Sequence, residues 1–120
     1  MYDSVIIGAG PGGYVCAIEI SKRGGKVCIV EKNGFGGTCT QRGCIPTKYL
    51  HSVADIIRKM SMLKVYGIDS KTDLNYKILK SKMFTTVAKL ASGIELLLKD
   101  NGVEIVEGEA EIISSNKVKV

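Results

Sequence analysis

A short apolar run that leads directly into a glycine-rich turn constrains the fold of this chain more than any other feature. The segment reads DSVIIGAGPGG, and its β-branched residues Val5, Ile6 and Ile7 are typical of a buried parallel strand. The next stretch, GYVCAIEISKRGG, shows helical spacing and stops at a glycine pair. The segment KVCIVEK then predicts a second buried strand that ends at Glu31. This order predicts a parallel βαβ unit and an α/β fold.

Three glycines and one acid in this unit follow the pattern of a dinucleotide-binding fold. Gly8 allows the tight turn, Gly10 lets the backbone approach a pyrophosphate at the start of the helix, and Gly13 allows helix and strand to pack closely. Glu31 follows Gly13 by eighteen positions and is predicted to accept hydrogen bonds from an adenosine ribose. The alternative is a structural βαβ unit whose glycines serve only its turn.

Composition and charge exclude several classes of protein. The chain has 120 residues, of which 45% are hydrophobic and 24% charged, enough for one folded domain. The net charge of +5 is dispersed and not interleaved with aromatic residues, which disfavours a nucleic-acid-binding protein. No apolar run reaches the ~18 residues of a membrane span, and the N-terminus does not resemble a signal peptide. We therefore expect a cytoplasmic protein with no nucleic-acid or membrane partner.

The four cysteines fall into two groups. Cys16 and Cys28 lie in apolar periodic stretches and are predicted to be small buried residues. Cys39 and Cys44 lie together in GGTCTQRGCIPTK. In one regular helix their separation along the axis is about 7.5 Å, beyond the usual Cα spacing of a disulfide. Gly43 is the residue that predicts a bend between them, and a bend can bring the sulfurs together.

The neighbours of this pair favour redox chemistry. Arg42 and Lys48 place positive charge near the thiols, and helical spacing from about Pro46 places a helix N-terminus beside Cys44, which favours a thiolate. Pro46 also disfavours a helical conformation at Ile45. A zinc site needs four ligands at closer spacing, so no metal is predicted. An accidental pair of free thiols is an alternative that the spacing leaves open.

The remaining residues predict two helices and then short strands. Apolar residues recur at helical spacing over residues 49–66 and 75–99, and a turn-rich segment connects them. This pattern predicts an antiparallel helical hairpin whose second helix ends at Asn101 and Gly102. The last eighteen residues predict two or three short strands with a turn at residues 114–116.

The motifs GAGPGG, EK and GGTCTQRGCIPTK together resemble those of the flavin-dependent pyridine nucleotide-disulfide oxidoreductases. The resemblance implies that residues 1–120 form the N-terminal part of a Rossmann-like FAD-binding domain, without the NAD-binding and C-terminal interface domains. Such a piece is expected to have little or no turnover alone. Among the branches of this family, the sequence GCIPTK is most similar to the branch that oxidises dihydrolipoamide. Gln41 and Arg42 depart from the asparagine and valine that are frequent between the two cysteines in this family.

The resemblance also implies residue roles. Cys39 is the thiol that exchanges with substrate, Cys44 passes electrons to the flavin through a thiolate-flavin charge-transfer complex, and Lys48 lies beside the flavin ring. The implied FAD-binding residues are Gly8, Gly10, Pro11 and Gly13 at the turn, Glu31 at the ribose, Lys32 and Ala110 at the adenine end, Gly37 and Thr38 at the diphosphate, and Cys39 and Lys48 near the flavin.

The implied reaction oxidises dihydrolipoamide to lipoamide through a Cys39–Cys44 disulfide and FAD, with NAD+ as the final acceptor. The implied partners are lipoyl domains of 2-oxo acid dehydrogenase or glycine cleavage complexes, with a role in cell redox homeostasis and a homodimeric complete enzyme. The family's catalytic base comes from the partner subunit, so His51 is predicted to be a surface residue. A related reductase of glutathione or mercuric ion and a noncatalytic nucleotide-binding thiol sensor remain alternatives.

Overall fold

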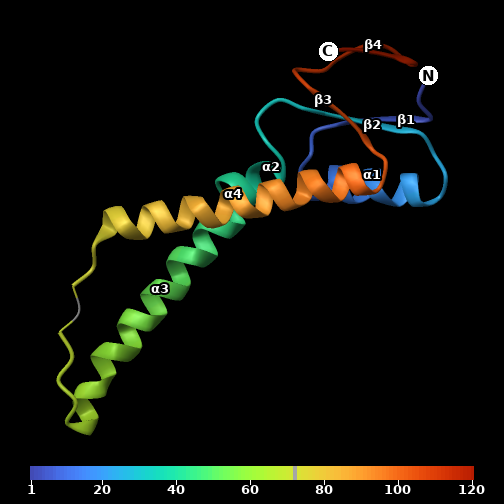
Figure 1. The fold of residues 1–120 in the computed structure, drawn as a ribbon. Helices are drawn as coiled ribbons and strands as arrows, with labels where there is room; N and C mark the ends of the chain where they lie inside the picture. The colour runs from blue at the N-terminus through green and yellow to red at the C-terminus, as the bar shows by residue number, and fades with distance from the viewer. Residues whose placement is uncertain (72) are drawn as a thin grey trace.

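A computed structural model describes residues 1–71 and 73–120 of the chain. It consists of a sheet-containing body and a helical arm that projects from it (Figure 1). The elements are β1 (Ser4–Ile7), α1 (Pro11–Lys22), β2 (Val27–Glu31), α2 (Gly37–Gln41), α3 (Cys44–Met62), the 3₁₀ helix η1 (Leu63–Tyr66), α4 (Tyr76–Asp100), β3 (Glu104–Glu107), β4 (Glu111–Ser114) and β5 (Lys117–Lys119). The molecule is elongated, with extents of 68 × 26 × 19 Å.

A parallel sheet in the order β1-β2-β3 forms the centre of the body. Its middle strand, β2, is buried from Val27 to Val30, as expected for a strand with neighbours on both sides. Figure 1 shows α1 and the end of α4 on one face of this sheet. Ala17, Ile29 and Leu98, one from each of these three elements, are fully buried in the core between them. The predicted α/β fold and parallel βαβ unit are confirmed. The predicted burial of the first strand is wrong, because β1 lies at the edge of the sheet and Val5 and Ile7 are exposed.

Helix α1 packs on the sheet through its smallest residues. A Cβ atom at Gly13 would lie 1.9 Å from the carbonyl oxygen of Gly8, so only glycine fits there. Ala17, one turn further, is fully buried on the same face. Cys16 is exposed, so its predicted burial is wrong: adjacent helical residues point about 100° apart, and Ala17 holds the inward position. The predicted burial of Cys28 is confirmed.

The two long helices form the predicted hairpin. Asn75 caps α4, because its side chain accepts a hydrogen bond from the Ile78 backbone N–H at 3.1 Å. Helix α3 starts at Cys44 and therefore includes Ile45, so the expectation that Pro46 keeps Ile45 out of a helix is wrong. Pro46 lies in the first turn, where its missing N–H has no helical partner to lose.

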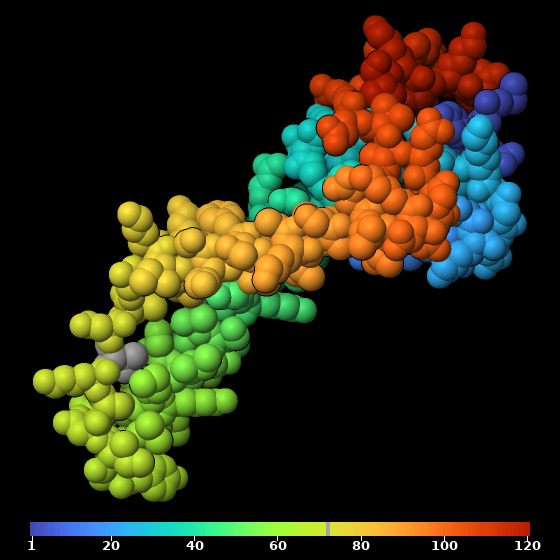
Figure 2. All heavy atoms as spheres, viewed as in Figure 1, coloured from blue at the N-terminus to red at the C-terminus, as the bar shows by residue number. Residues whose placement is uncertain are grey.

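The hairpin is loosely packed at its outer end. In Figure 1, α3 and α4 meet near α2 and diverge toward their connection. Within α3, which is described throughout, no residue is buried. Figure 2 shows the outer halves of these helices as a narrow arm beside the thicker body. None of the helices in the described residues combines the length and apolar character needed to cross a membrane.

The C-terminal residues follow the predicted order of short strands. β3 joins the parallel sheet beside β2, and β4 and β5 form a separate antiparallel hairpin. Both chain termini lie at the sheet end of the molecule (Figure 1). The loop between β3 and β4 lies at the ends of β1 and β2, where the Gly108 N–H donates a hydrogen bond to the Glu31 carbonyl at 3.0 Å.

The packing of α1 predicts opposite effects of alanine at two adjacent glycines. Gly13→Ala places a methyl group against the Gly8 carbonyl and is expected to lower the free energy of unfolding by about 2 kcal/mol or more. Gly12→Ala meets no atom within 4 Å and is expected to raise it by up to about 1 kcal/mol, as helical glycine is unfavourable. Urea denaturation of both variants measures the difference, and equal stabilities would contradict the close packing.

Candidate active site

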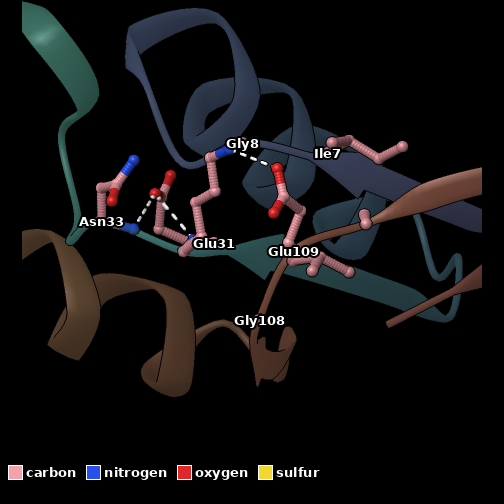
Figure 3. A pocket seen from close by; sticks show the side chains of 9 residues that line it. Ile7, Gly8, Glu31, Asn33, Gly108 and Glu109 are labelled. Atoms are coloured by element: carbon pink, nitrogen blue, oxygen red, sulfur yellow. Dashed lines mark hydrogen bonds and ion pairs between the residues drawn. The ribbon is translucent and has the colours of Figure 1, made fainter.

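A first cavity of about 170 Å³ lies at the carboxyl ends of the parallel strands. Figure 3 shows this pocket between the end of β1, the end of β2 and the loop after β3. In parallel sheets this edge is where ligands bind, because the loops that follow the strands can be shaped without disturbing the sheet. Its lining residues are Ile7, Gly8, Val30, Glu31, Lys32, Asn33, Gly108, Glu109 and Ala110.

The Glu31 carboxylate organises this edge through three backbone hydrogen bonds. One oxygen accepts from the Ala9 N–H at 2.7 Å, which ties the glycine turn to the end of β2. The other accepts from the N–H groups of Lys32 at 2.9 Å and Asn33 at 2.7 Å. An ionised carboxylate has about four acceptor positions, so roughly one remains for a ribose hydroxyl. Glu31 thus has a structural task in addition to its predicted ribose contact.

Lys32 and Glu109 form an ion pair at the mouth of the same cavity. The Lys32 Nζ lies 2.5 Å from the Glu109 Oε1, and both side chains are largely exposed. Hydrogen bonding and charge attraction from Lys32 lower the pKa of the Glu109 carboxyl below its usual value. The pair joins the end of β2 to the loop that carries Ala110, and this loop forms one wall of the pocket. The structure therefore brings together the residues predicted for the adenine end.

A second cavity, of about 220 Å³, lies between the glycine turn and the cysteine segment. Its lining includes Gly8 and Gly10 from the turn and Gly37 and Thr38 from α2. Pro11 is the first residue of α1, and Gly10 caps this helix without a side-chain hydrogen bond. The first-turn N–H groups of α1 are thus not occupied by a capping side chain, as a diphosphate bound at a helix N-terminus requires.

The glycine turn and the cysteine segment are in direct contact. The Gly36 N–H donates a hydrogen bond to the Ala9 carbonyl at 2.8 Å. Gly37 has a φ of 57°, and a Cβ atom there would lie 2.8 Å from the Gly10 Cα. Gly37 therefore needs to be glycine for both its conformation and its close approach. This contact fixes α2, and with it Cys39, beside the nucleotide turn.

The two cysteines lie at the junction of two helices. Cys39 belongs to α2 and Cys44 is the first residue of α3, with Gly43 between the helices. A Cβ atom at Gly43 would lie 3.0 Å from the Thr38 carbonyl oxygen, so this glycine lets α3 start close against α2. The predicted bend is confirmed. It brings the Cys39 thiol close enough to Cys44 for the two side chains to affect the Cys39 pKa.

The Cys39 thiol holds its proton more tightly than an ordinary cysteine. Its pKa is raised, first by the hydrogen bond to Cys44 and then by desolvation and by the charge of Cys44. Lys48 lowers this pKa, but its effect is smaller. Lys48 thus favours the thiolate, as expected, but the contacts of Cys39 with Cys44 and its desolvation outweigh this effect on the pKa. Among the described residues, Lys48 is the cation that acts on Cys39, and Arg42 is not.

Gln41 has a structural role that sequence patterns did not indicate. Its side chain donates to the Phe35 carbonyl at 2.9 Å and so holds α2 against the preceding loop. The predicted surface position of His51 is confirmed: it is exposed on α3, where its Nδ1 lies 3.4 Å from the Asp55 Oδ2. Within the described part of the chain, no group of three or more His, Cys, Asp or Glu residues is arranged to hold a metal ion.

Comparisons with known proteins agree with this geometry. The family model of the pyridine nucleotide-disulphide oxidoreductases matches residues 2–120. The chain is 42% identical to a dihydrolipoyl dehydrogenase of Mycoplasma genitalium, over 99% of this chain and 26% of that protein. It is 41% identical to that of Staphylococcus aureus and 40% identical to that of Geobacillus stearothermophilus, each over 98% of this chain and 25% of the relative.

The chain belongs to the pyridine nucleotide-disulphide oxidoreductase family. It spans about a quarter of the length of the curated relatives that it matches. The match covers both cavities and the cysteine pair, so the family resemblance of the motifs is confirmed over almost all of the chain.

The hydrogen bonds of Glu31 predict that its charge stabilises the turn even without a ligand. Glu31→Gln replaces one acceptor oxygen by an NH₂ group, which leaves a backbone N–H unpaired. The substitution is expected to lower the free energy of unfolding by about 1–3 kcal/mol. Hydrogen exchange of the Ala9 amide should become faster. Glu107→Gln, at the exposed end of β3, is the matched control and should leave this exchange rate unchanged. Unchanged protection of Ala9 in Glu31→Gln would contradict the assignment.

The contacts of Cys39 predict opposite pH shifts in two variants. Cys44→Ala removes the hydrogen bond that raises the Cys39 pKa, so the alkylation profile of Cys39 should move to lower pH. Lys48→Gln removes the charge that lowers this pKa, so the profile should move to higher pH. Iodoacetamide labelling resolved by mass spectrometry measures both, with the exposed Cys16 as a reference for rate. Shifts in the same direction would contradict the geometry.

Proposed function

We propose that this chain is the amino-terminal FAD-binding and disulfide-bearing segment of a dihydrolipoyl dehydrogenase. The observation that carries the proposal is the contact of the glycine turn with Gly36 and Gly37, directly before Cys39. Through this contact the glycine turn, where the dinucleotide would bind, lies next to the segment that carries the two cysteines. The names and identities of the relatives support the choice of enzyme within the family.

The chain's own residues supply the binding of the cofactor. In this proposal the α1 N-terminus and the Gly10 backbone bind the diphosphate, with Thr38 nearby. Glu31 accepts one ribose hydroxyl, and Lys32 and Ala110 border the adenine. Bound FAD supplies two-electron redox chemistry, and NAD+ is the final acceptor through residues outside this segment.

The thiol pair performs the exchange with substrate. A thiolate of dihydrolipoamide attacks the Cys39 sulfur of the Cys39–Cys44 disulfide, and the Cys44 sulfur leaves with the bonding electron pair. The second substrate sulfur then displaces Cys39, which releases lipoamide and leaves both cysteines reduced. In this proposal the proton of the second substrate thiol passes to Cys39, whose raised pKa favours the thiol form, while Lys48 contributes positive charge beside Cys39.

Further expectations depend on this activity. The substrate would be carried by a lipoyl domain of a 2-oxo acid dehydrogenase or glycine cleavage complex. The complete enzyme would act in the cytoplasm as a homodimer and contribute to cell redox homeostasis. The exposed apolar side chains of the helical arm, such as Ile56, Met62 and Phe84, support the presence of a covering surface in that enzyme.

The test uses the protein expressed from its complete reading frame and loaded with FAD. It should reduce NAD+ with dihydrolipoamide, and Cys39→Ser or Cys44→Ser should each lower kcat about a thousandfold or more, because the disulfide cannot form. Cys16→Ser, an exposed thiol on α1, is the control and should keep full activity. Reduction of glutathione disulfide or mercuric ion without dihydrolipoamide oxidation would indicate a related reductase. A protein without FAD or activity would indicate a thiol sensor.

A further inference from the structure

We propose that Arg42 is a cationic ligand for the diphosphate of the bound dinucleotide, an addition that rests on the proposed function. Arg42 ends α2 as its C-terminal cap and is exposed. It lines the 220 Å³ cavity together with Gly8 and Gly10 of the turn and Thr38 of α2. This is the cavity in which the diphosphate is expected, at the N-terminus of α1.

The charge of Arg42 is available to a ligand. Among the ion pairs of the described residues, none involves Arg42, whereas Arg23, Lys32, Arg58 and Lys99 each have a carboxylate partner. The acid that lines this cavity, Glu31, already accepts three backbone hydrogen bonds. Arg42, which has no ion-pair partner among the described residues, therefore lines a cavity whose one acidic lining residue already accepts three backbone hydrogen bonds.

Arg42 is not the cation that affects the Cys39 pKa. Arg42 lies between Cys39 and Cys44 in the sequence, and a role in thiol activation is the obvious alternative. The charge that lowers the Cys39 pKa comes from Lys48, four residues after Cys44 on α3, and not from Arg42. Lys48 is thus the cation that affects Cys39, whereas Arg42 lines the cavity.

The chemistry of the guanidinium suits this position. The N-terminus of α1 offers neutral N–H donors and the partial charge of the helix, but no formal positive charge. A diphosphate carries two negative charges, and arginine donates planar, bidentate hydrogen bonds to phosphate oxygens. Charge-assisted bonds of this kind change affinity by about tenfold or more.

The experiment titrates the apoprotein, expressed from its complete reading frame, with FAD. We expect Arg42→Gln to weaken FAD binding about tenfold or more and Arg42→Lys to weaken it less, since lysine keeps the charge but not the bidentate geometry. Arg23→Gln removes the same charge from an exposed cap at the far end of α1 and should leave FAD binding unchanged. ADP competition should weaken with Arg42→Gln, whereas competition by adenosine, which has no phosphate, should not.

Two results would overturn the role of Arg42 alone. The first is equal FAD affinity of Arg42→Gln and the parent protein. The second is an equal loss of affinity for adenosine and ADP, which would indicate a general change of the pocket. If the parent protein binds no FAD, the proposed function is wrong and the role of Arg42 falls with it.

Discussion

The contact between the glycine turn and the residues before Cys39 determines how the rest of the site is arranged. The Gly36 N–H to Ala9 carbonyl bond joins the two loops, and the close approach of Gly37 to Gly10 leaves no room for a side chain at Gly37. Because α2 starts at Gly37, this contact sets the direction in which α2 presents Cys39 and Arg42. The start of α3, and so Cys44, follows through the tight junction at Gly43.

Charge is distributed along the site in a way that matches the parts of a dinucleotide. A carboxylate, Glu31, lies at the strand ends, where a neutral ribose is expected. Arg42, which has no ion-pair partner in the part of the chain that the structure describes, lines the cavity beside the helix N-terminus, where a diphosphate is expected. Lys48 lies one turn into α3 and acts on the thiol pair. This order from adenine end to thiols supports a single extended ligand that crosses both cavities.

Local patterns predicted most of the fold, since they are determined by a few neighbouring residues. The β-branched runs predicted the strands β1 and β2, although only β2 is buried, the helical spacing predicted the hairpin, and Gly8 with its φ of 95° forms the expected turn. Burial of single side chains was less predictable. Cys16 and Ala17 differ by one position in a helix, and only the packing of α1 on the sheet decides which of them is inside.

Contacts between distant residues could not be predicted from one sequence. Lys32 and Glu109 are 77 residues apart and meet because the loop after β3 returns to the end of β2. The three backbone bonds of Glu31 depend on the conformations of two separate loops. The start of α3 at Cys44 also differs from the local preference, because the first turn of a helix accepts a proline that its interior excludes.

The absorbance spectrum of the FAD-loaded protein after two-electron reduction tests most directly whether this junction places a thiol against the flavin. The account predicts a long-wavelength charge-transfer band in the parent protein and its loss in Cys44→Ser. A protein that binds FAD stoichiometrically and is fully reduced, but shows no such band, would contradict it.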